Sequence, residues 1–206
     1  MDNFKSAVIL AGGKSSRMKF DKQCLVINEK KLIFEICEKL EKYFEDITIV
    51  SNKKEYYKDC KYKVVSDEIK EVGPLGGMAV GLKESVSEYV YFIACDMPHI
   101  DDKYIKYMKS KIEKDIESNV DFDMYICNVG GNIQFFQGFY KKDLEECINN
   151  YLIYGTKKSI KSFCEQSNKK IKIIEEDEFK EQHFKEDIFI NLNTQVDLNL
   201  YKNNLQ

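Results

Sequence analysis

Short apolar runs that alternate with helical stretches are the feature that most restricts how this chain can fold. Residues 4–10, 47–50, 63–65 and 89–95 are rich in β-branched and aromatic side chains, which is typical of strands. The last of these runs is apolar at nearly every position from Tyr89 to Ala94, as in a strand that is covered on both faces. Strands that alternate with helices predict an α/β fold with a mainly parallel sheet between two helical layers.

Two stretches between these runs have the spacing of amphipathic helices. Apolar side chains recur every three or four residues in both of them: Ile33, Ile36, Cys37, Leu40 and Phe44 in the first, and Ile105, Met108, Ile112 and Ile116 in the second. This spacing places each set on one helix face. Asp101 or Asp102 is a suitable N-cap for the second helix. Further along, residues 122–127 and 133–139 flank Gly130 and Gly131, which predicts an antiparallel hairpin added to the sheet.

Length and composition limit the class of protein. The 206 residues contain no Pro/Gly/Ser-rich linker, so we expect a single domain over residues 1–206. A net charge of −3 argues against a nucleic-acid-binding protein. The seven cysteines form no C-x-x-C pair, which favours free thiols in a reducing cytoplasm over disulfides or a zinc site. The sequence has neither a signal peptide nor an apolar run of 18 residues, so no membrane association is predicted.

A glycine-rich, basic segment follows the first predicted strand. Gly12 and Gly13 permit close approach of backbone N–H groups to a ligand. They are followed by Lys14, Arg17, Lys19 and Lys22 against the single acid Asp21, a combination that suits a polyphosphate. Arg17 is the only arginine among 32 basic residues, and its planar guanidinium can bind phosphate oxygens bidentately. The alternative is an ordinary turn followed by solvated lysines. The segment matches neither the Walker A loop nor the dinucleotide fingerprint.

The other informative residues also follow predicted strands, where open α/β sheets bind their ligands. Asp67 follows residues 63–65, Asp96 follows residues 89–95, and a predicted loop at Gly73–Gly77 precedes a helix-like stretch. A carboxylate at the end of a buried strand needs a partner. For Asp96 the two options are a cap hydrogen bond and a divalent metal such as Mg²⁺, which accepts one or two carboxylates together with phosphate oxygens and water.

The segment Leu-Ala-Gly-Gly-Lys-Ser-Ser-Arg-Met-Lys-Phe-Asp-Lys at residues 10–22 resembles the signature loop of the molybdenum cofactor guanylyltransferases, within the nucleotidyltransferase superfamily. Asp-Met-Pro at residues 96–98 and Asn-Leu-Asn-Thr at 191–194 resemble further motifs of this family, so the similarity runs from residue 7 to about residue 200. The resemblance implies a three-layer, Rossmann-like nucleotidyltransferase fold.

The resemblance also implies a role for each matching residue. Guanine and ribose would contact Leu10, Ala11, Gly12 and Gly13, whereas Arg17 and Lys22 would bind the triphosphate and act in catalysis. Asp67 and Asp96 would bind the nucleotide, Asp96 through Mg²⁺. Asn191 and Asn193 would lie on the pterin side. Two positions depart from the family pattern. Lys19 stands where glycine is usual, and a hairpin proline is missing near Gln134 and Gln137.

The implied reaction is the transfer of GMP from GTP to the terminal phosphate of molybdopterin, with release of pyrophosphate and formation of molybdopterin guanine dinucleotide. The attacking phosphate is already an anion, so neither His99 nor His183 is needed as a base. Molybdenum-insertion proteins and molybdoenzyme chaperones would be further partners. The alternatives are a CTP-dependent molybdopterin cytidylyltransferase, a sugar-phosphate nucleotidyltransferase, and a catalytically silent nucleotide-binding regulator. Related cytidylyltransferases carry alanine at the position of Gly12, which favours guanine.

Overall fold

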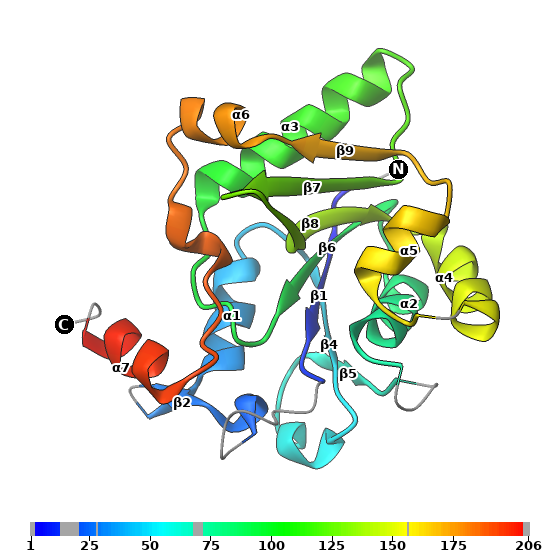
Figure 1. Ribbon diagram of the computed structural model, residues 1–206. Helices are drawn as coiled ribbons and strands as arrows, with labels where there is room; N and C mark the ends of the chain where they lie inside the picture. The colour runs from blue at the N-terminus through cyan, green and yellow to red at the C-terminus, as the bar shows by residue number, and fades with distance from the viewer. Residues whose placement is uncertain (1–2, 13–20, 28, 68–71, 156, 204–206) are drawn as a thin grey trace.

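A seven-stranded sheet crosses the molecule, with helices on both of its faces (Figure 1). The computed structural model describes residues 3–12, 21–27, 29–67, 72–155 and 157–203. The sheet strands are β1 (Ser6–Leu10), β4 (Asp46–Val50), β5 (Lys63–Val65), β6 (Tyr89–Ala94), β7 (Met124–Val129), β8 (Asn132–Lys141) and β9 (Ile171–Ile174), in the order β5-β4-β1-β6-β8-β7-β9. β2 (Val26–Ile27) and β3 (Lys30–Lys31) form a separate two-stranded ribbon.

The four predicted sheet strands are confirmed and run parallel. β1 lies between β4 and β6, with Ala7 opposite both Ile47 and Tyr91. The predicted hairpin is also confirmed: β7 and β8 are antiparallel, and β8 joins the sheet by antiparallel pairing with β6. Gly130 and Gly131 form its turn with φ of +60° and +69°, a left-handed conformation that glycine adopts without strain. β9, which pairs parallel with β7, was not predicted from the sequence.

The helices form two layers. They are α1 (Leu32–Leu40), α2 (Pro74–Glu84), α3 (Asp102–Glu117), α4 (Leu144–Tyr154), α5 (Ile160–Gln166), α6 (Glu176–Glu181) and α7 (Gln195–Asn203), with short 3₁₀ turns η1 (Lys22–Cys24), η2 (Lys54–Tyr57) and η3 (Glu186–Phe189). The predicted N-cap is Asp101, whose carboxylate accepts hydrogen bonds from the N–H groups of Lys103 and Tyr104. No helix among the described residues is both long and apolar enough to cross a bilayer.

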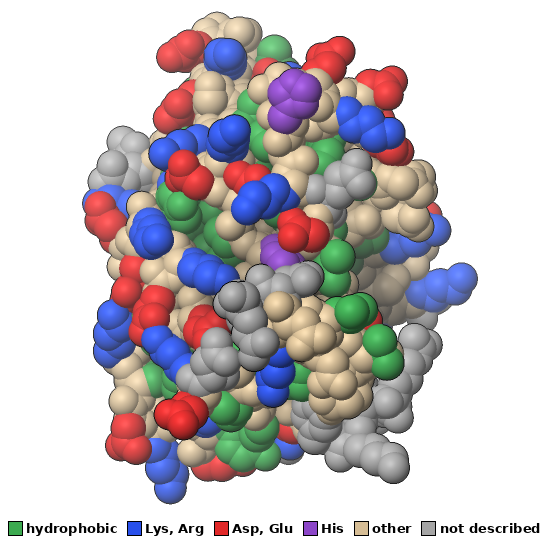
Figure 2. Space-filling model, turned by 90° about the vertical axis from the view of Figure 1, so that its left-hand side faces the viewer, with side chains coloured by type: hydrophobic (Ala, Val, Ile, Leu, Met, Phe, Trp, Pro, Cys, Tyr) green, Lys and Arg blue, Asp and Glu red, His purple; other side chains and the backbone are tan. Residues whose placement is uncertain are grey.

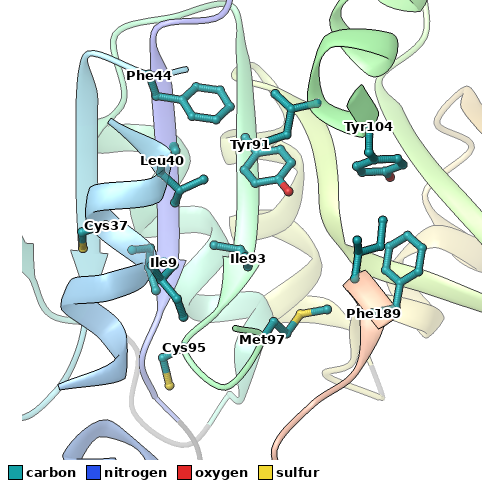
Figure 3. Packing of buried hydrophobic residues seen from close by; sticks show 14 of the residues in the cluster. Ile9, Cys37, Leu40, Phe44, Tyr91, Ile93, Cys95, Met97, Tyr104 and Phe189 are labelled. Carbon is teal, nitrogen blue, oxygen red and sulfur yellow. The ribbon is translucent and has the colours of Figure 1, made fainter. Parts of the chain in front are cut away.

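Hydrophobic cores fill both sides of the sheet. One core joins α1, α3, α6 and the segment after α6 to the sheet, and the other joins α2, α4 and α5 to the opposite face. In Figure 3, Leu40 of α1 and Ile9 of β1 lie in the layer between this helix and the sheet, while Cys95 and Met97 continue the core beyond the end of β6. The alternation of strands and helices therefore produces the predicted three layers, in which the central strands β1 and β6 bury both of their faces.

The glycine-rich stretch that was predicted to be a loop is largely helical. α2 begins at Pro74, where a proline has no N–H that the helix would need. A Cβ on Gly81 would lie 2.7 Å from Cγ1 of Val8 and 3.0 Å from Phe92. This glycine therefore allows the helix to approach the sheet closely. The loop prediction gave too much weight to the conformational freedom of glycine, and packing against β1 and β6 decides the structure.

Gln137 occupies the region where the family proline is missing. It is fully buried and has a φ of +56°. Its Oε1 accepts a hydrogen bond from the Tyr91 hydroxyl at 3.0 Å, and its Nε2 donates to the carbonyl oxygens of His99 and Ile188. One side chain therefore joins the sheet to the loop after β6 and to the C-terminal segment.

Gln137→Ala is expected to lower the free energy of unfolding by roughly 3–4 kcal/mol, because it leaves three buried polar groups without partners. The matched control is Gln134→Ala, which removes one exposed hydrogen bond of 3.4 Å and should cost at most about 0.5 kcal/mol. Urea unfolding followed by circular dichroism measures both values. Equal midpoints for the two variants would contradict this account of Gln137.

Candidate active site

A cavity of about 260 Å³ opens at the carboxyl ends of β1 and β6. Among the described residues, the lining comes from six parts of the chain: Leu10, Ala11 and Gly12 at the end of β1; Asp21, Lys22 and Gln23 at η1; Pro74 of α2; Ala94, Cys95 and Asp96 at the end of β6; Phe136 of β8; and Asn191 and Asn193. The position agrees with the rule that open α/β sheets bind ligands beyond the carboxyl ends of their strands.

Lys22 lies at the meeting point of three of these segments. Its Nζ is 2.5 Å from Oδ2 of Asp96 and 2.5 Å from Oδ1 of Asn193. Asp21 caps the η1 turn, because its carboxylate accepts a hydrogen bond from the N–H of Gln23 at 3.1 Å. The turn thereby fixes the backbone position of Lys22. The ammonium group of Lys22 then reaches Asp96 and Asn193, which lie 74 and 171 positions away in the sequence.

Asp96 is nearly buried, with 7% of its surface exposed. It follows β6 directly, and its carbonyl oxygen accepts a hydrogen bond from the N–H of Leu192 at 2.9 Å. This bond holds the C-terminal segment against the end of β6 and brings Asn191 and Asn193 to the cavity. A carboxylate in this position requires a positive partner, and Lys22 provides it in the free protein.

The structure gathers most of the predicted site residues. Those that line the cavity are Leu10, Ala11, Gly12, Lys22, Asp96, Asn191 and Asn193. Asp67 does not line it; it lies past β5, where its N–H donates to Oδ1 of Asn52 at 3.1 Å. Gly13 and Arg17, together with Lys14 and Lys19, lie outside the described residues.

The Asp67 carboxylate packs against the first turn of α2. A Cβ built on Gly76 would lie 2.7 and 2.8 Å from its two oxygens and would also overlap with Val72. This helix turn therefore sets the position of Asp67, and the contact gives a way to displace the carboxylate without replacing it.

Gly76→Ala is expected to weaken GTP binding about five- to tenfold, because the new methyl group moves the Asp67 carboxylate, which the family resemblance assigns to the nucleotide. Overpacking should also cost about 1–3 kcal/mol of stability. Gly81→Ala is the matched control, since it overpacks the same helix against Val8 and leaves Asp67 in place. Calorimetric titration of GTP into both folded variants separates the two effects. If both bind GTP as the wild type does, Asp67 makes no nucleotide contact.

The oxygens around Lys22 Nζ fit a hard cation such as Mg²⁺. The carboxylate of Asp96 and the amide oxygen of Asn193 both face one positively charged point, and both are oxygen ligands of the kind that Mg²⁺ prefers. Within the described ranges, no group of three or more His, Cys, Asp or Glu side chains is arranged to hold a metal. A cation here would therefore take its remaining ligands from phosphate oxygens and water.

Six lining residues were not predicted as site residues, namely Asp21, Gln23, Pro74, Ala94, Cys95 and Phe136. Sequence patterns give no signal for Gln23 or Phe136, because neither belongs to a motif. Burial raises the pKa of the Cys95 thiol, so this cysteine stays protonated and is unsuited to act as a nucleophile. His99 lies near the site but does not line it; its Nδ1 is 3.1 Å from Asp187, and its ring packs edge-on against Tyr201.

The mostly parallel sheet and the cavity at its strand ends define an α/β protein with a ligand site, and the comparisons with known proteins identify an enzyme of the nucleotidyltransferase class. The model of the MobA-like NTP transferase domain matches residues 7–169. A probable molybdenum cofactor guanylyltransferase from Peptoclostridium acidaminophilum is 42% identical over 96% of this chain and 88% of that protein. A molybdenum cofactor guanylyltransferase from Syntrophotalea carbinolica is 41% identical over 97% and 91%.

A solved structure supports the same fold. Molybdopterin-guanine dinucleotide biosynthesis protein A from Archaeoglobus fulgidus superimposes with a TM-score of 0.76 over 97% of this chain and 98% of that one, at 19% identity. The chain belongs to the MobA-like NTP transferase family.

Proposed function

We propose that this enzyme transfers GMP from GTP to the terminal phosphate of molybdopterin. The observation that carries the proposal is the convergence of Lys22, Asp96 and Asn193 at the strand ends, which places a cation, a carboxylate and an amide in one cavity. Their motifs are those that resemble the guanylyltransferase family, and relatives at 41% and 42% identity carry that name.

The reaction is a displacement at phosphorus. An oxygen of the terminal phosphate of molybdopterin forms a bond to the α-phosphorus of GTP, and the bond from that phosphorus to the bridging oxygen breaks. The electron pair leaves with pyrophosphate. The nucleophile is an anion, so the protein supplies alignment and charge stabilisation instead of a general base. Lys22 and Arg17 are proposed to stabilise the negative charge on the phosphates.

Each remaining site residue has a proposed task. Leu10, Ala11, Gly12 and Gly13 would contact guanine and ribose, Asp67 would contact the nucleotide, and Asn191 and Asn193 would contact the pterin. Asp96 would hold Mg²⁺ together with oxygens of the triphosphate. When bound, the ion neutralises part of the charge on the leaving pyrophosphate.

We propose that residues 1–206 act as one domain, since one sheet joins segments from Ser6 to Ile174. We propose a cytoplasmic location, which fits the seven free cysteines. On the face that carries α1, α6 and α7, acidic and basic side chains are interspersed (Figure 2). A surface of mixed charge fits a protein whose substrates are small molecules. Molybdenum-insertion proteins and molybdoenzyme chaperones are proposed as further partners.

Pyrophosphate release from GTP, CTP, ATP and UTP, each with and without molybdopterin, tests the reaction. We expect release only with GTP, and only when molybdopterin is present. Release with CTP and molybdopterin would assign the enzyme to the cytidylyltransferases instead.

GTP is expected to bind at least about tenfold more tightly than CTP, because Gly12 leaves room for a purine. A Cβ built on Gly12 meets no atom of the described residues within 4 Å, so Gly12→Ala should leave the melting temperature unchanged. The added methyl group would occupy ligand space and weaken GTP binding about tenfold, with a smaller effect on CTP. Calorimetric titration of both nucleotides measures these values, and equal binding of GTP and CTP by the wild type would overturn the guanine assignment.

A further inference from the structure

Gln23 is a buried polar side chain in the wall of the cavity. It follows Lys22 in the η1 turn, only 5% of its surface is exposed, and it contributes to the cavity lining. A carboxamide has one acceptor oxygen and one nitrogen with two protons. Burial is costly when either end lacks a hydrogen-bond partner, so the partners of both ends carry information.

The oxygen end of Gln23 is fully used. Its Oε1 accepts hydrogen bonds from the hydroxyl of Ser51 at 2.5 Å and from that of Tyr57 at 3.0 Å. Ser51 follows β4 and Tyr57 ends η2, and both are buried. A carbonyl oxygen has two lone pairs, so these two bonds use its acceptor capacity.

The same two hydroxyls fix which way the amide points. The oxygen of Ser51 already accepts a hydrogen bond from the N–H of Lys53 at 3.0 Å, and its proton is directed to Gln23. Burial raises the pKa of the Tyr57 hydroxyl, which therefore keeps its proton and donates it. Reversing the amide would turn its NH₂ group toward these hydroxyls and leave at least one buried hydroxyl proton without an acceptor, a cost that the observed orientation avoids.

The nitrogen end remains available at the cavity. Ser51 and Tyr57 do not line the cavity, whereas Gln23 does. No oxygen of the described residues accepts a hydrogen bond from Nε2 of Gln23. The two hydroxyl contacts thus orient the carboxamide as a fixed, neutral donor beside Lys22.

We propose that Gln23 is a nucleotide-contacting residue, whose Nε2 donates a hydrogen bond to an acceptor atom of the nucleotide bound in this cavity. The inference rests on the proposed nucleotidyl transfer and adds to it a substrate contact from outside the recognised motifs. Because the donor is held in place before the ligand arrives, forming the bond requires little further ordering of the side chain.

Two substitutions test the contact. Gln23→Glu keeps an oxygen to accept from Ser51 and Tyr57 but replaces the donor by a negative charge. Gln23→Met has similar length, no charge and no donor. Both variants are expected to bind GTP at least about fivefold more weakly than the wild type in calorimetric titrations, since each lacks the hydrogen bond. Titrating GMP as well places the acceptor: a loss retained with GMP assigns it to the base, ribose or α-phosphate, and a loss confined to GTP assigns it to the β- or γ-phosphate.

Tyr57→Phe is the control for packing. It removes one bond to the oxygen end and keeps the donor, so it should lower the melting temperature by roughly 2–4 °C and leave the affinity for GTP within about twofold. If Gln23→Met binds GTP as the wild type does while Gln23→Glu binds weakly, the effect is charge repulsion alone and the proposed contact is wrong.

A second measurement needs no variant. In crystals of the wild-type protein grown with GTP, Nε2 of Gln23 should lie within about 3.2 Å of a nucleotide acceptor; a separation above about 4 Å overturns the inference. Titration of CTP, ATP and UTP into the wild type distinguishes a failure of the Gln23 contact from a failure of the proposed GTP specificity. If another nucleotide binds more tightly, GTP specificity fails, and the Gln23 contact is then tested with that nucleotide in both experiments.

Discussion

Asp96→Asn is expected to reduce the rate of pyrophosphate release by on the order of 10³-fold with little change in melting temperature. Asparagine keeps the shape and can still accept the hydrogen bond from Lys22 Nζ, which is 2.5 Å from Oδ2 of Asp96 in the wild type. It lacks the negative charge that a hard cation prefers. The backbone bond from Leu192 to the carbonyl of residue 96 does not depend on the side chain, so the C-terminal segment should stay in place.

Pyrophosphate release measured over a series of Mg²⁺ concentrations tests the Asp96 prediction. Asp102→Asn is the matched control, because Asp102 forms an exposed ion pair with Lys106 on α3 and does not line the cavity. We expect this control to retain near-normal turnover. If Asp96→Asn kept wild-type activity with an unchanged Mg²⁺ optimum, Asp96 would have a structural role and the metal would bind elsewhere.

Lys22→Met is expected to lower kcat by roughly 100- to 1000-fold, because the ammonium group is proposed to stabilise negative charge on the phosphates. Methionine retains most of the apolar stem and removes the charge together with the hydrogen bonds that Nζ donates to Asp96 and Asn193. The substitution also leaves the nearly buried Asp96 without its positive partner, which should reduce stability when nucleotide and metal are absent. Added Mg²⁺ should restore part of that stability by binding the freed carboxylate.

Lys53→Met provides the comparison for Lys22→Met. Lys53 forms an ion pair with Asp21 at 2.6 Å and does not line the cavity, so we expect a change in kcat below about threefold. Thermal unfolding with and without Mg²⁺ accompanies the kinetic measurements on both variants. A kcat for Lys22→Met within about threefold of the wild type would show that the lysine does not act on the phosphates.

The sequence by itself determined the local elements and the family. The apolar run at residues 89–94 became β6, the apolar positions of residues 33–40 became the buried face of α1, and Asp101 caps α3. These predictions held because side-chain periodicity and capping act over a few residues. The last apolar position of α3, Ile116, is 37% exposed, because periodicity indicates which face is apolar but not how far along the helix the core extends.

Only the tertiary structure decided which of these residues meet. Lys22, Asp96 and Asn193 are separated by up to 171 positions and share one contact point, because β6 lies beside β1 and the C-terminal segment is bonded to the end of β6. Packing between distant segments also decides that Gly81 allows α2 to approach the sheet closely. It likewise leaves Asp67 outside the cavity lining. Distances across the sheet follow from strand order and side-chain packing between distant segments, and local sequence patterns do not encode either.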